Sequence, residues 1–251
     1  MVTVRHLLRP WYQRAAILSR AARSGTVRAA LRQRASWRHA RLARMEFTEV
    51  IRRRRMIRHY TDESISPDAI ERILASALRA PSAGFSQGWA FLVLTRAEDR
   101  SRFWRFVPTR VEQTPTMQLA PLVVVPLAHK AAYLERYAEP DKGWEDRAEA
   151  HWPAPYWFID TGMASLLILL TAVDEGLDAC FFGIQPDQLA PFRAEFDIPS
   201  DYAPIGGITV GHRAPDTPPQ AAAVEARRRV CLLYTSPSPR DRTRSRMPSS
   251  A

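Results

Sequence analysis

The chain has very few cysteines, and this excludes several classes of protein. Its 251 residues include only two, Cys180 and Cys231. A disulfide framework needs several paired cysteines. A CxxC motif, in which two residues separate a pair of cysteines that bind metal or undergo redox chemistry, is also absent. Disulfides belong mainly to oxidising compartments, so the sequence favours a reduced, cytoplasmic protein.

Motifs of several enzyme classes are also missing. The six histidines show no metal-ligand spacing such as HExxH, and there is no GxSxG, P-loop or GxGxxG motif. We therefore expect no metal site, no acyl transfer and no Rossmann-type dinucleotide fold. No continuous apolar run reaches membrane-spanning length, which argues against a membrane partner.

Acidic residues and lysine are absent from residues 1–44, which hold eleven arginines. Ordinary mixed charge begins at Glu46, so the composition changes at Met45. A basic stretch of this kind is typical of a transit peptide, of a nucleic-acid-binding arm, or of an upstream reading frame in a GC-rich genome. We favour the last and interpret residues 1–44 as a non-native or disordered extension.

The other end of the chain resembles translated sequencing-library DNA. Residues 231–241 (CLLYTSPSPRD) and 245–251 (SRMPSSA) both match a transposase-type adapter in one frame. We exclude residues 231–251 from fold reasoning and expect the native C-terminus to be missing. Residues 45–230 hold 21 basic and 25 acidic side chains, whereas the whole chain has 36 and 26. The basic balance is therefore no argument for a nucleic-acid partner.

We predict one α+β domain over residues 45–230, a length that allows a sizeable core. The apolar pattern and capping residues predict helices at 46–54, 66–80, 100–106, 158–175 and 186–196, and strands at 89–94, 122–127, 177–184 and 205–210. An irregular, aromatic stretch covers 133–157. Because the chain begins with a pair of helices, α+β is preferred to a doubly wound sheet.

Two segments carry the chemistry that the sequence indicates. The first is RRRRMIRHY at residues 52–60, an arginine cluster at the end of a short helix. Guanidinium groups present fixed, forked donors that suit a phosphate dianion. An ordinary solvated basic helix end has the same appearance, since most charge runs lie at the surface.

The second segment is APSAGFSQGW at residues 80–89, where a predicted helix gives way to an apolar strand. Its glycines let backbone N–H donors come close to a flat heterocycle. A plain helix-to-strand loop is the alternative. Together, in this order and one helix apart, the two segments indicate a flavin site.

Both segments resemble the FMN-binding start of the nitroreductase family. Residues 54–60 are similar to its pattern of two arginines, two variable residues, arginine, one variable residue and an aromatic. The resemblance implies that Arg54 and Arg55 hold the FMN phosphate side and that Arg58 supports them. It covers most of residues 45–230 and implies a central mixed or antiparallel sheet flanked by helices, in a homodimer.

The proline-serine loop of the family contacts the ribityl chain and the edge of the isoalloxazine ring. The resemblance assigns these contacts to Pro81, Ser82, Ala83, Phe85 and Gln87. Where this chain has Phe85 the family often has asparagine, and where it has Gly88 the family often has proline. These departures put the contacts around the ring in question.

Two later segments complete the resemblance. Residues 176–184 (GLDACFFGI) resemble the strand along one ring face, which implies that Phe182 and Gly183 present backbone near the flavin N5. A buried apolar strand looks similar. Residues 206–213 and the arginines at 227–229 resemble the late strand and basic cluster that complete phosphate binding, with Arg227 and Arg229 as contacts.

Six aromatic residues fall where the family carries a variable excursion over its active site. Stacking on an aromatic acceptor is one role for them, and packing within the helices or across a dimer interface is the other. We consider them substrate-pocket candidates: Tyr133, Tyr137, Trp144, Trp152, Tyr156 and Trp157.

The resemblance implies an FMN-dependent oxidoreductase in which two subunits share two flavin sites. Hydride passes from NAD(P)H through flavin N5 to an oxidised small molecule such as a nitroaromatic or a quinone, with ping-pong kinetics and no nucleophilic side chain. Two other classes stay open. One is a flavoprotein that binds or senses FMN without turnover; the other is a nucleic-acid-binding protein using residues 1–44, where Trp11, Tyr12 and Trp37 accompany the arginines.

Overall fold

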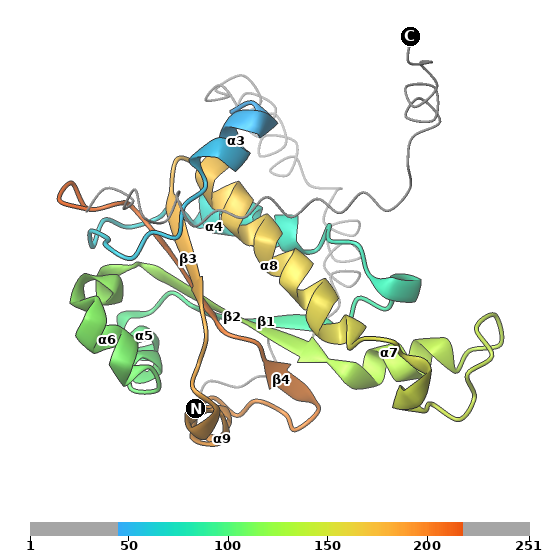
Figure 1. Cartoon of the computed structure of the whole chain (residues 1–251). Helices are drawn as coiled ribbons and strands as arrows, with labels where there is room; N and C mark the ends of the chain where they lie inside the picture. Colours follow the sequence, from blue (N-terminus) through green and yellow to red (C-terminus); the bar gives the residue numbers. More distant parts are fainter. Residues whose placement is uncertain (1–44, 218–251) are drawn as a thin grey trace, which may run out of the picture. The chain divides into compact units, whose positions relative to one another are not determined.

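The computed structural model describes residues 45–217 of the chain (Figure 1). The basic extension at 1–44, the adapter-like tail at 231–251 and the candidate phosphate contacts Arg227 and Arg229 lie outside the described residues. The boundaries expected for the domain at its two ends therefore stay predictions.

A five-stranded antiparallel sheet forms the centre of the described region. The order of strands is β1-β2-β5-β3, and β4 pairs with the far part of β2. The strands are β1 (Trp89–Leu94), β2 (Leu122–His129), β3 (Asp178–Phe182), β4 (Tyr202–Pro204) and β5 (Gly207–Gly211). Strand β2 is almost wholly buried because neighbouring strands cover both of its edges and helices cover both of its faces.

Helices cover both faces of the sheet. The helices α4 (Pro67–Ala77) and α8 (Tyr156–Asp174) share one apolar cluster with one face, while α5 (Ala97–Trp104) and α9 (Pro186–Glu195) share a second cluster with the other. The remaining elements are α3 (Phe47–Arg53), α6 (Pro108–Gln113) and α7 (Lys130–Tyr137), with the short 3-10 turns η2 (Ala83–Phe85), η3 (Pro115–Leu119) and η4 (Glu149–His151).

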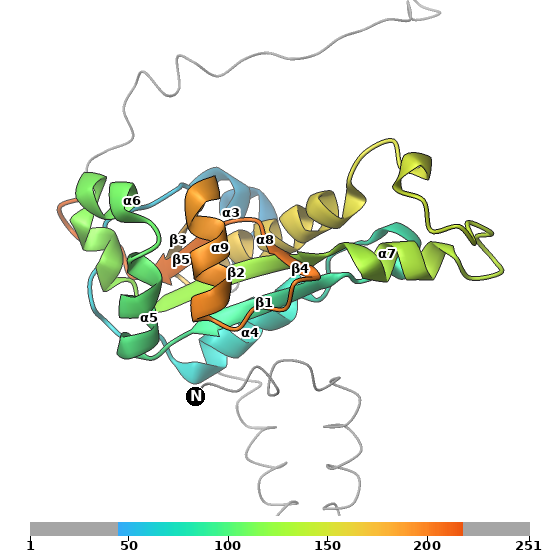
Figure 2. The same ribbon diagram turned by 90° about the horizontal axis from the view of Figure 1, so that it is seen from below.

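Helix α8 is the central helix of the fold. It crosses one face of the sheet diagonally, with α3 near its C-terminal end and α7 near its N-terminal end (Figure 1). In Figure 2, α5 and α6 lie at one end of the sheet and α7 extends beyond the other end. Three large apolar side chains of α8 remain exposed, Phe158, Ile159 and Leu166 at 43%, 44% and 46%. They recur at helical spacing and form a stripe, which we call the α8 stripe.

By length and composition alone, α8 could cross a membrane, since its 19 residues have a mean hydropathy of 1.6. However, 56% of that window is buried within the described region. Its inner face packs against α4 and the sheet, and its buried Thr161 and Ser165 hydroxyls donate to carbonyls of the same helix. These contacts are those of a core helix.

The α+β prediction is confirmed, and most predicted elements are present. Strand β1 has its predicted bounds, and Ser66 caps α4 by accepting the Ala69 N–H at 3.3 Å. The prediction of irregular structure at 133–157 was wrong at its start, where α7 is helical. The sequence KAAYLERY of α7 is rich in good helix formers, and this outweighs its aromatics. The short α6 and β4 were not predicted.

Candidate active site

The arginine segment runs along the open edge of β3. Beyond α3, Met56 forms a parallel bridge with Ala179. The Ile57 N–H donates to the Ala179 carbonyl at 3.1 Å, and the Phe181 N–H donates to Met56 Sδ at 3.4 Å. Strand β3 is an end strand of the sheet, so this segment covers part of an edge that would otherwise be free.

Tyr60 fixes the far end of the arginine segment. Its hydroxyl donates to the Ile57 carbonyl at 2.6 Å and lies 3.1 Å from Thr209 Oγ1. The side chain is buried, and burial raises the pKa of its hydroxyl far above the usual value. The phenol therefore stays protonated and serves as a structural donor.

A cavity of about 390 Å³ lies where the end of α3 meets the end of α8 and the start of β3. Four arginines line it, against a single acid. The lining residues are Met45, Arg52, Arg53, Arg55, Val173, Gly176, Leu177, Asp178 and Arg213. The cavity is therefore a candidate site for an anionic group.

Carboxylates orient three of these arginines. Glu49 accepts two bonds from Arg52, at 2.6 and 2.7 Å, and another from Arg53. These bonds lower the pKa of Glu49 to about 2, so it stays ionised at neutral pH. Asp178 accepts two bonds from Arg213, at 2.7 and 3.0 Å. Two carboxylates thus oppose four guanidinium groups, which leaves an excess of positive charge.

A second cationic group lies beside Cys180, whose side chain faces the cluster with α5 and α9. Burial raises the pKa of the Cys180 thiol, and the guanidinium groups of Arg58 and Arg110 both oppose this rise. The Arg110 guanidinium also lies 6.0 Å from the centre of the Phe182 ring. Both arginines therefore approach the same stretch of β3.

Arg58 and Arg110 are also incompletely satisfied. Each has a buried Nε–H without a hydrogen-bond partner among residues 45–217. Buried donors without acceptors cost free energy, so they call for an explanation. The phosphate or carbonyl oxygens of a flavin nucleotide are acceptors of the kind they lack, and the residues present therefore fit that group.

The three predicted arginines do not lie in one place. Arg55 lines the cavity and donates to two carbonyls of its own segment, while Arg58 belongs to the group beside Cys180. Arg54 is half-buried at the end of α3 and makes no ion pair with the described residues. The sequence did not single out Arg110 or Arg213 as ligands, because only the fold brings α6 and the end of β5 to this region.

The proline-serine loop is held by hydrogen bonds within itself and from α7. The Gln87 N–H donates to Ser82 Oγ at 3.0 Å. Arg136 of α7 donates from Nε to the Gly84 carbonyl at 3.0 Å. Gly84 has φ +59, and a Cβ there would come within 2.6 Å of the Tyr137 ring. The loop therefore lies tightly against α7, and the position of Gly84 requires glycine.

Asp160, which no sequence pattern singled out as a site residue, connects the same loop to α8. Its carboxylate is 1% exposed, and Oδ2 accepts the Ala83 N–H at 2.8 Å and the Tyr133 hydroxyl at 2.9 Å. Burial and then this bond raise the pKa of Tyr133 far above its usual value, so the phenol remains a donor. The available signal was an acid within an apolar helix, since a buried carboxylate requires donors.

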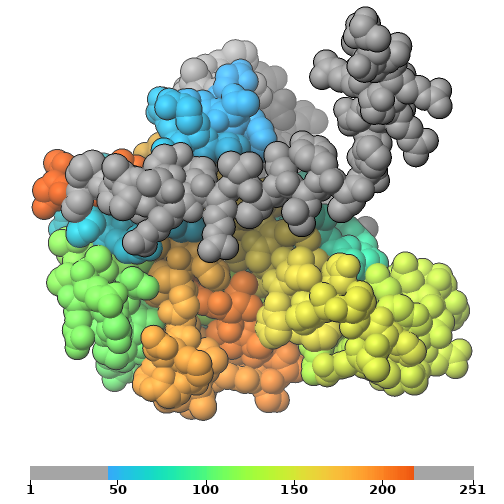
Figure 3. Space-filling model, in the orientation of Figure 1, coloured from blue at the N-terminus to red at the C-terminus, as the bar shows by residue number. Residues whose placement is uncertain are grey.

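Four of the aromatic candidates form a half-buried cluster between α7 and the start of α8. Ring centres lie 4.4 Å apart for Tyr137 and Trp152, 4.8 Å for Tyr137 and Trp144, and 5.6 Å for Trp152 and Tyr156. Figure 3 shows the surrounding segment, in yellow-green, as a projection from the described body. The proline-serine loop contacts this cluster through Gly84.

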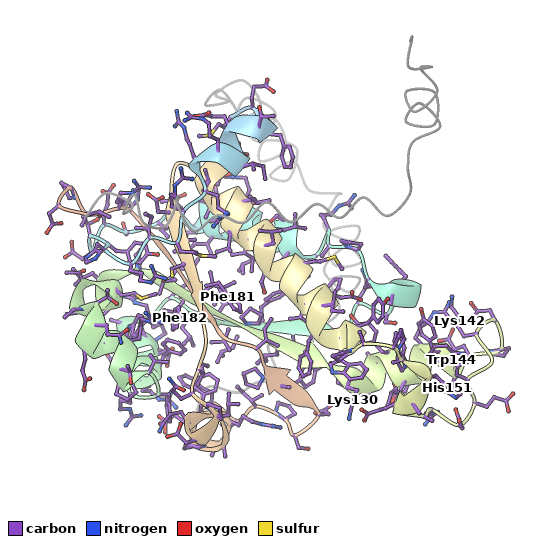
Figure 4. All side chains as sticks on the ribbon, viewed as in Figure 1. Lys130, Lys142, Trp144, His151, Phe181 and Phe182 are labelled. Atoms are coloured by element: carbon purple, nitrogen blue, oxygen red, sulfur yellow. The ribbon has the colours of Figure 1, made fainter. Side chains whose placement is uncertain are left out.

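The other two aromatic candidates, Tyr133 and Trp157, are buried beneath this cluster. The packing interpretation therefore describes these two side chains better than direct access to a substrate. Figure 4 shows Trp144 and His151 in the projection, well away from Phe181 on β3. The structure brings all six aromatic candidates together, but at the opposite side from the β3 candidates.

On β3, the two candidates differ in position. The Phe182 side chain is buried, with its ring stacked 6.1 Å from that of Trp104. The Ala179 carbonyl and the Phe181 N–H face the arginine segment, away from β5. Backbone groups alternate along a strand, and the same alternation continued one residue past the end of β3 would place the Gly183 N–H on this open side. Gly183 is therefore better placed than Phe182 to donate to a ligand.

The two predicted flavin-binding segments lie at opposite ends of α8. The Met45 N–H, next to α3, donates to Asp174 at 3.1 Å, whereas the Ala83 N–H of the loop donates to Asp160. Fourteen residues separate these acids on one helix, a distance of roughly 21 Å at 1.5 Å per residue. Within one chain, the segments do not converge on a common point (Figure 1).

Comparison with known proteins identifies relatives of this chain. The family model described as "Nitroreductase family" matches residues 51–212. A provisionally named NADH dehydrogenase/NAD(P)H nitroreductase of Methanothermobacter thermautotrophicus is 27% identical over 176 residues, covering 69% of this chain and 81% of the relative. One with the same name from Archaeoglobus fulgidus is 28% identical over 169 residues, covering 66% of this chain and 85% of the relative.

Solved structures share the fold. A provisionally named NADH oxidase of Clostridium acetobutylicum has a TM-score of 0.52 at 27% identity, over 67% of this chain and 89% of that one. A provisionally named nitroreductase of Exiguobacterium sibiricum, crystallised in complex with FMN, has a TM-score of 0.58 at 22% identity, over 70% of this chain and 92% of that one.

Proposed function

The chain belongs to the nitroreductase family of oxidoreductases, and we propose that it binds FMN and passes hydride from NAD(P)H to an oxidised small molecule. The relative crystallised with FMN and the relatives named as NAD(P)H nitroreductases support this cofactor and this reductant. When bound, FMN supplies the two-electron redox chemistry.

The observation that carries the proposal is the arginine segment on the open edge of β3. With Arg110 and Arg213 beside it, the segment combines an excess of guanidinium groups with the two buried Nε–H donors of Arg58 and Arg110 that lack acceptors within 45–217. Arg54 and Arg55 bind the phosphate side of the cofactor. Arg58 and Arg110 donate to its oxygens, and Gly183 presents a backbone N–H. No side chain acts as a nucleophile.

A second copy of the chain completes each site. The loop at 81–87 and the arginine segment lie near opposite ends of α8, where Asp160 and Asp174 are roughly 21 Å apart, so a two-fold related copy is needed to bring the two together. The exposed α8 stripe supplies an apolar surface for this contact. Obligate homodimer interfaces of this kind bury roughly 2,000–5,000 Å².

Nitroaromatics and quinones are the proposed acceptors. The sequence has no separate dinucleotide-binding motif, so NAD(P)H and the acceptor use the same place in turn. Release of the oxidised dinucleotide before the acceptor enters gives ping-pong kinetics. The half-buried aromatic cluster beside the proline-serine loop supports a flat aromatic acceptor.

The first test is the identity and reactivity of the cofactor. We expect the purified protein to be yellow, to release FMN and not FAD on denaturation, and to lose its visible absorbance when NADH or NADPH is added without oxygen. Arg54→Ala should weaken FMN binding by about 1.5–3 kcal/mol, the usual cost of losing a charged hydrogen-bond partner. Flavin fluorescence titration measures this change.

Arg96→Ala is the control, since exposed Arg96 pairs only with Glu98 in the described region, and its FMN affinity should stay at the wild-type value. A colourless protein that also fails to bind added FMN would contradict the proposed function. A yellow protein that neither NADH nor NADPH reduces would indicate an FMN-binding or sensing role instead.

A further inference from the structure

Phe85 is an unusually placed aromatic residue. Its side chain is 75% exposed, the highest value among the large exposed hydrophobic residues of the described region. Its backbone has φ +57, in the left-handed region. Glycine and asparagine adopt this conformation, but bulky residues rarely do. Both the exposure and the backbone conformation cost free energy.

Asparagine is, after glycine, a residue type that suits this backbone conformation. Asparagine tolerates the left-handed region, because its short polar side chain bonds locally. Phenylalanine gains no such bond. Phe85 therefore has a backbone conformation that its residue type disfavours. Strained residues of this kind persist where the surrounding structure fixes them, and they are concentrated at functional sites.

The surroundings of Phe85 do fix it. The Phe85 N–H donates to the Ser82 carbonyl at 3.0 Å within η2. Before it, the Gly84 carbonyl accepts a hydrogen bond from Arg136. After it, the Gln87 N–H donates to Ser82 Oγ. Asp160 holds the start of the turn from α8. The ring is thus carried on a rigid turn rather than on a loose loop.

The chemistry of the ring indicates what it contacts. A phenyl group cannot hydrogen-bond to the hydroxyls of a ribityl chain, as an asparagine amide can. It offers a flat apolar face, which suits another flat ring. The turn contacts Tyr137 of the half-buried cluster through Gly84, the residue before Phe85 in the chain.

We propose that Phe85 is a specificity-determining residue, whose ring packs against a flat aromatic electron acceptor and selects it over acceptors without a ring. This inference rests on the proposed function and names the substrate class of the same site. Across the dimer, the ring belongs to the site whose arginines come from the other copy.

The experiment compares two acceptors, 1,4-naphthoquinone and ferricyanide, with the full chain. Phe85→Asn removes the ring and suits the left-handed backbone. We expect it to lower kcat/KM for the quinone relative to ferricyanide by roughly tenfold, mainly through KM, as expected for a lost ring contact. Phe85→Tyr keeps the ring and should restore the wild-type ratio.

Phe47→Asn is the matched control, because Phe47 is also an exposed phenylalanine, at 68%, but lies on α3. It should leave the ratio between the two acceptors unchanged. An unchanged ratio in Phe85→Asn would overturn the inference. So would an equal loss for both acceptors accompanied by dissociation of the dimer, because the ring would then be an interface contact.

The two proposals fail in different ways. If the wild-type protein releases no FMN or is not reduced by NAD(P)H, the proposed function itself fails. If wild-type protein turns over both acceptors and Phe85→Asn keeps their ratio, only the role of Phe85 fails.

Discussion

At the scale of single residues, the site depends on polar groups that the core holds in fixed positions. Asp160 accepts from both the proline-serine loop and α7, and a buried carboxylate is stable only when such donors surround it. On the arginine segment, Tyr60 has the equivalent role through Ile57 and Thr209. One buried polar side chain therefore helps to attach each predicted binding segment to the core.

Removing the carboxylate of Asp160 should affect both stability and cofactor binding. Asp160→Ala leaves the part-buried Ala83 N–H and the buried Tyr133 hydroxyl without their acceptor, which should lower the free energy of unfolding by about 2–5 kcal/mol. It should also weaken FMN binding, since it frees the loop. Asp160→Asn keeps an acceptor oxygen and should lie closer to wild type. Urea denaturation and flavin fluorescence measure the two effects.

Ser165→Ala is the control for this change, because Ser165 is equally buried in α8 but bonds only to a carbonyl of its own helix. It should alter the free energy of unfolding only slightly and leave FMN affinity unchanged. The role assigned to Asp160 is wrong if Asp160→Ala and Ser165→Ala behave alike.

At the scale of elements, the sequence predicted helices and strands correctly where their signals lie within the segment itself. The apolar run of β1 and the serine-proline start of α4 are local signals, and both elements formed as predicted. Strand β4 has three residues and ends in proline, and it exists only because β2 lies beside it. Its pairing could not be predicted from its own residues.

The apolar sequence of α8 predicted a central helix. It did not predict which face of the helix would pack on the sheet and which would be exposed. Its inner face lies on the sheet, while the stripe of Phe158, Ile159 and Leu166 is exposed. An apolar stripe of this width on a core helix is typical of a surface that meets a second protein chain. We expect this surface to form the dimer contact.

Leu166→Glu should therefore disrupt the dimer. By symmetry the change occurs twice in one interface, and each lost leucine contact removes about 1.5 kcal/mol or more, so the dimer dissociation constant should rise at least ~100-fold. Sedimentation velocity over a range of concentrations measures this. Leu119→Glu changes a similarly exposed leucine on η3, at 44%, and should leave the dimer intact. Dimers of equal strength in both variants would exclude the α8 stripe as the interface.

At the scale of the whole molecule, the sequence predicted the family and the two binding segments but not their arrangement. The motifs at 52–60 and 80–89 are only one helix apart in the sequence, which gives no sign of how far apart they lie in the fold. Helix α8 holds them at its two ends. The roles of Arg110 and Asp160 depend on contacts between distant segments, and no local pattern encodes such contacts.

In the proposed dimer, each flavin site combines the arginine segment of one chain with the loop of another. Co-expression of two differently tagged chains tests it, one carrying Arg54→Ala with Arg58→Ala and the other Asp160→Ala. Each variant alone should bind little FMN, because both of its sites have one damaged half. In the mixed dimer, one site contains both damaged halves, and the other site contains two intact halves.

The measurement is the FMN content of the mixed dimer after purification through both tags. If the sites are shared between chains, the mixed dimer should hold about half of the wild-type FMN content and should show NAD(P)H oxidation that neither parent shows. A mixed dimer with no more FMN than its two parents would contradict the account, because each flavin would then be bound within a single chain.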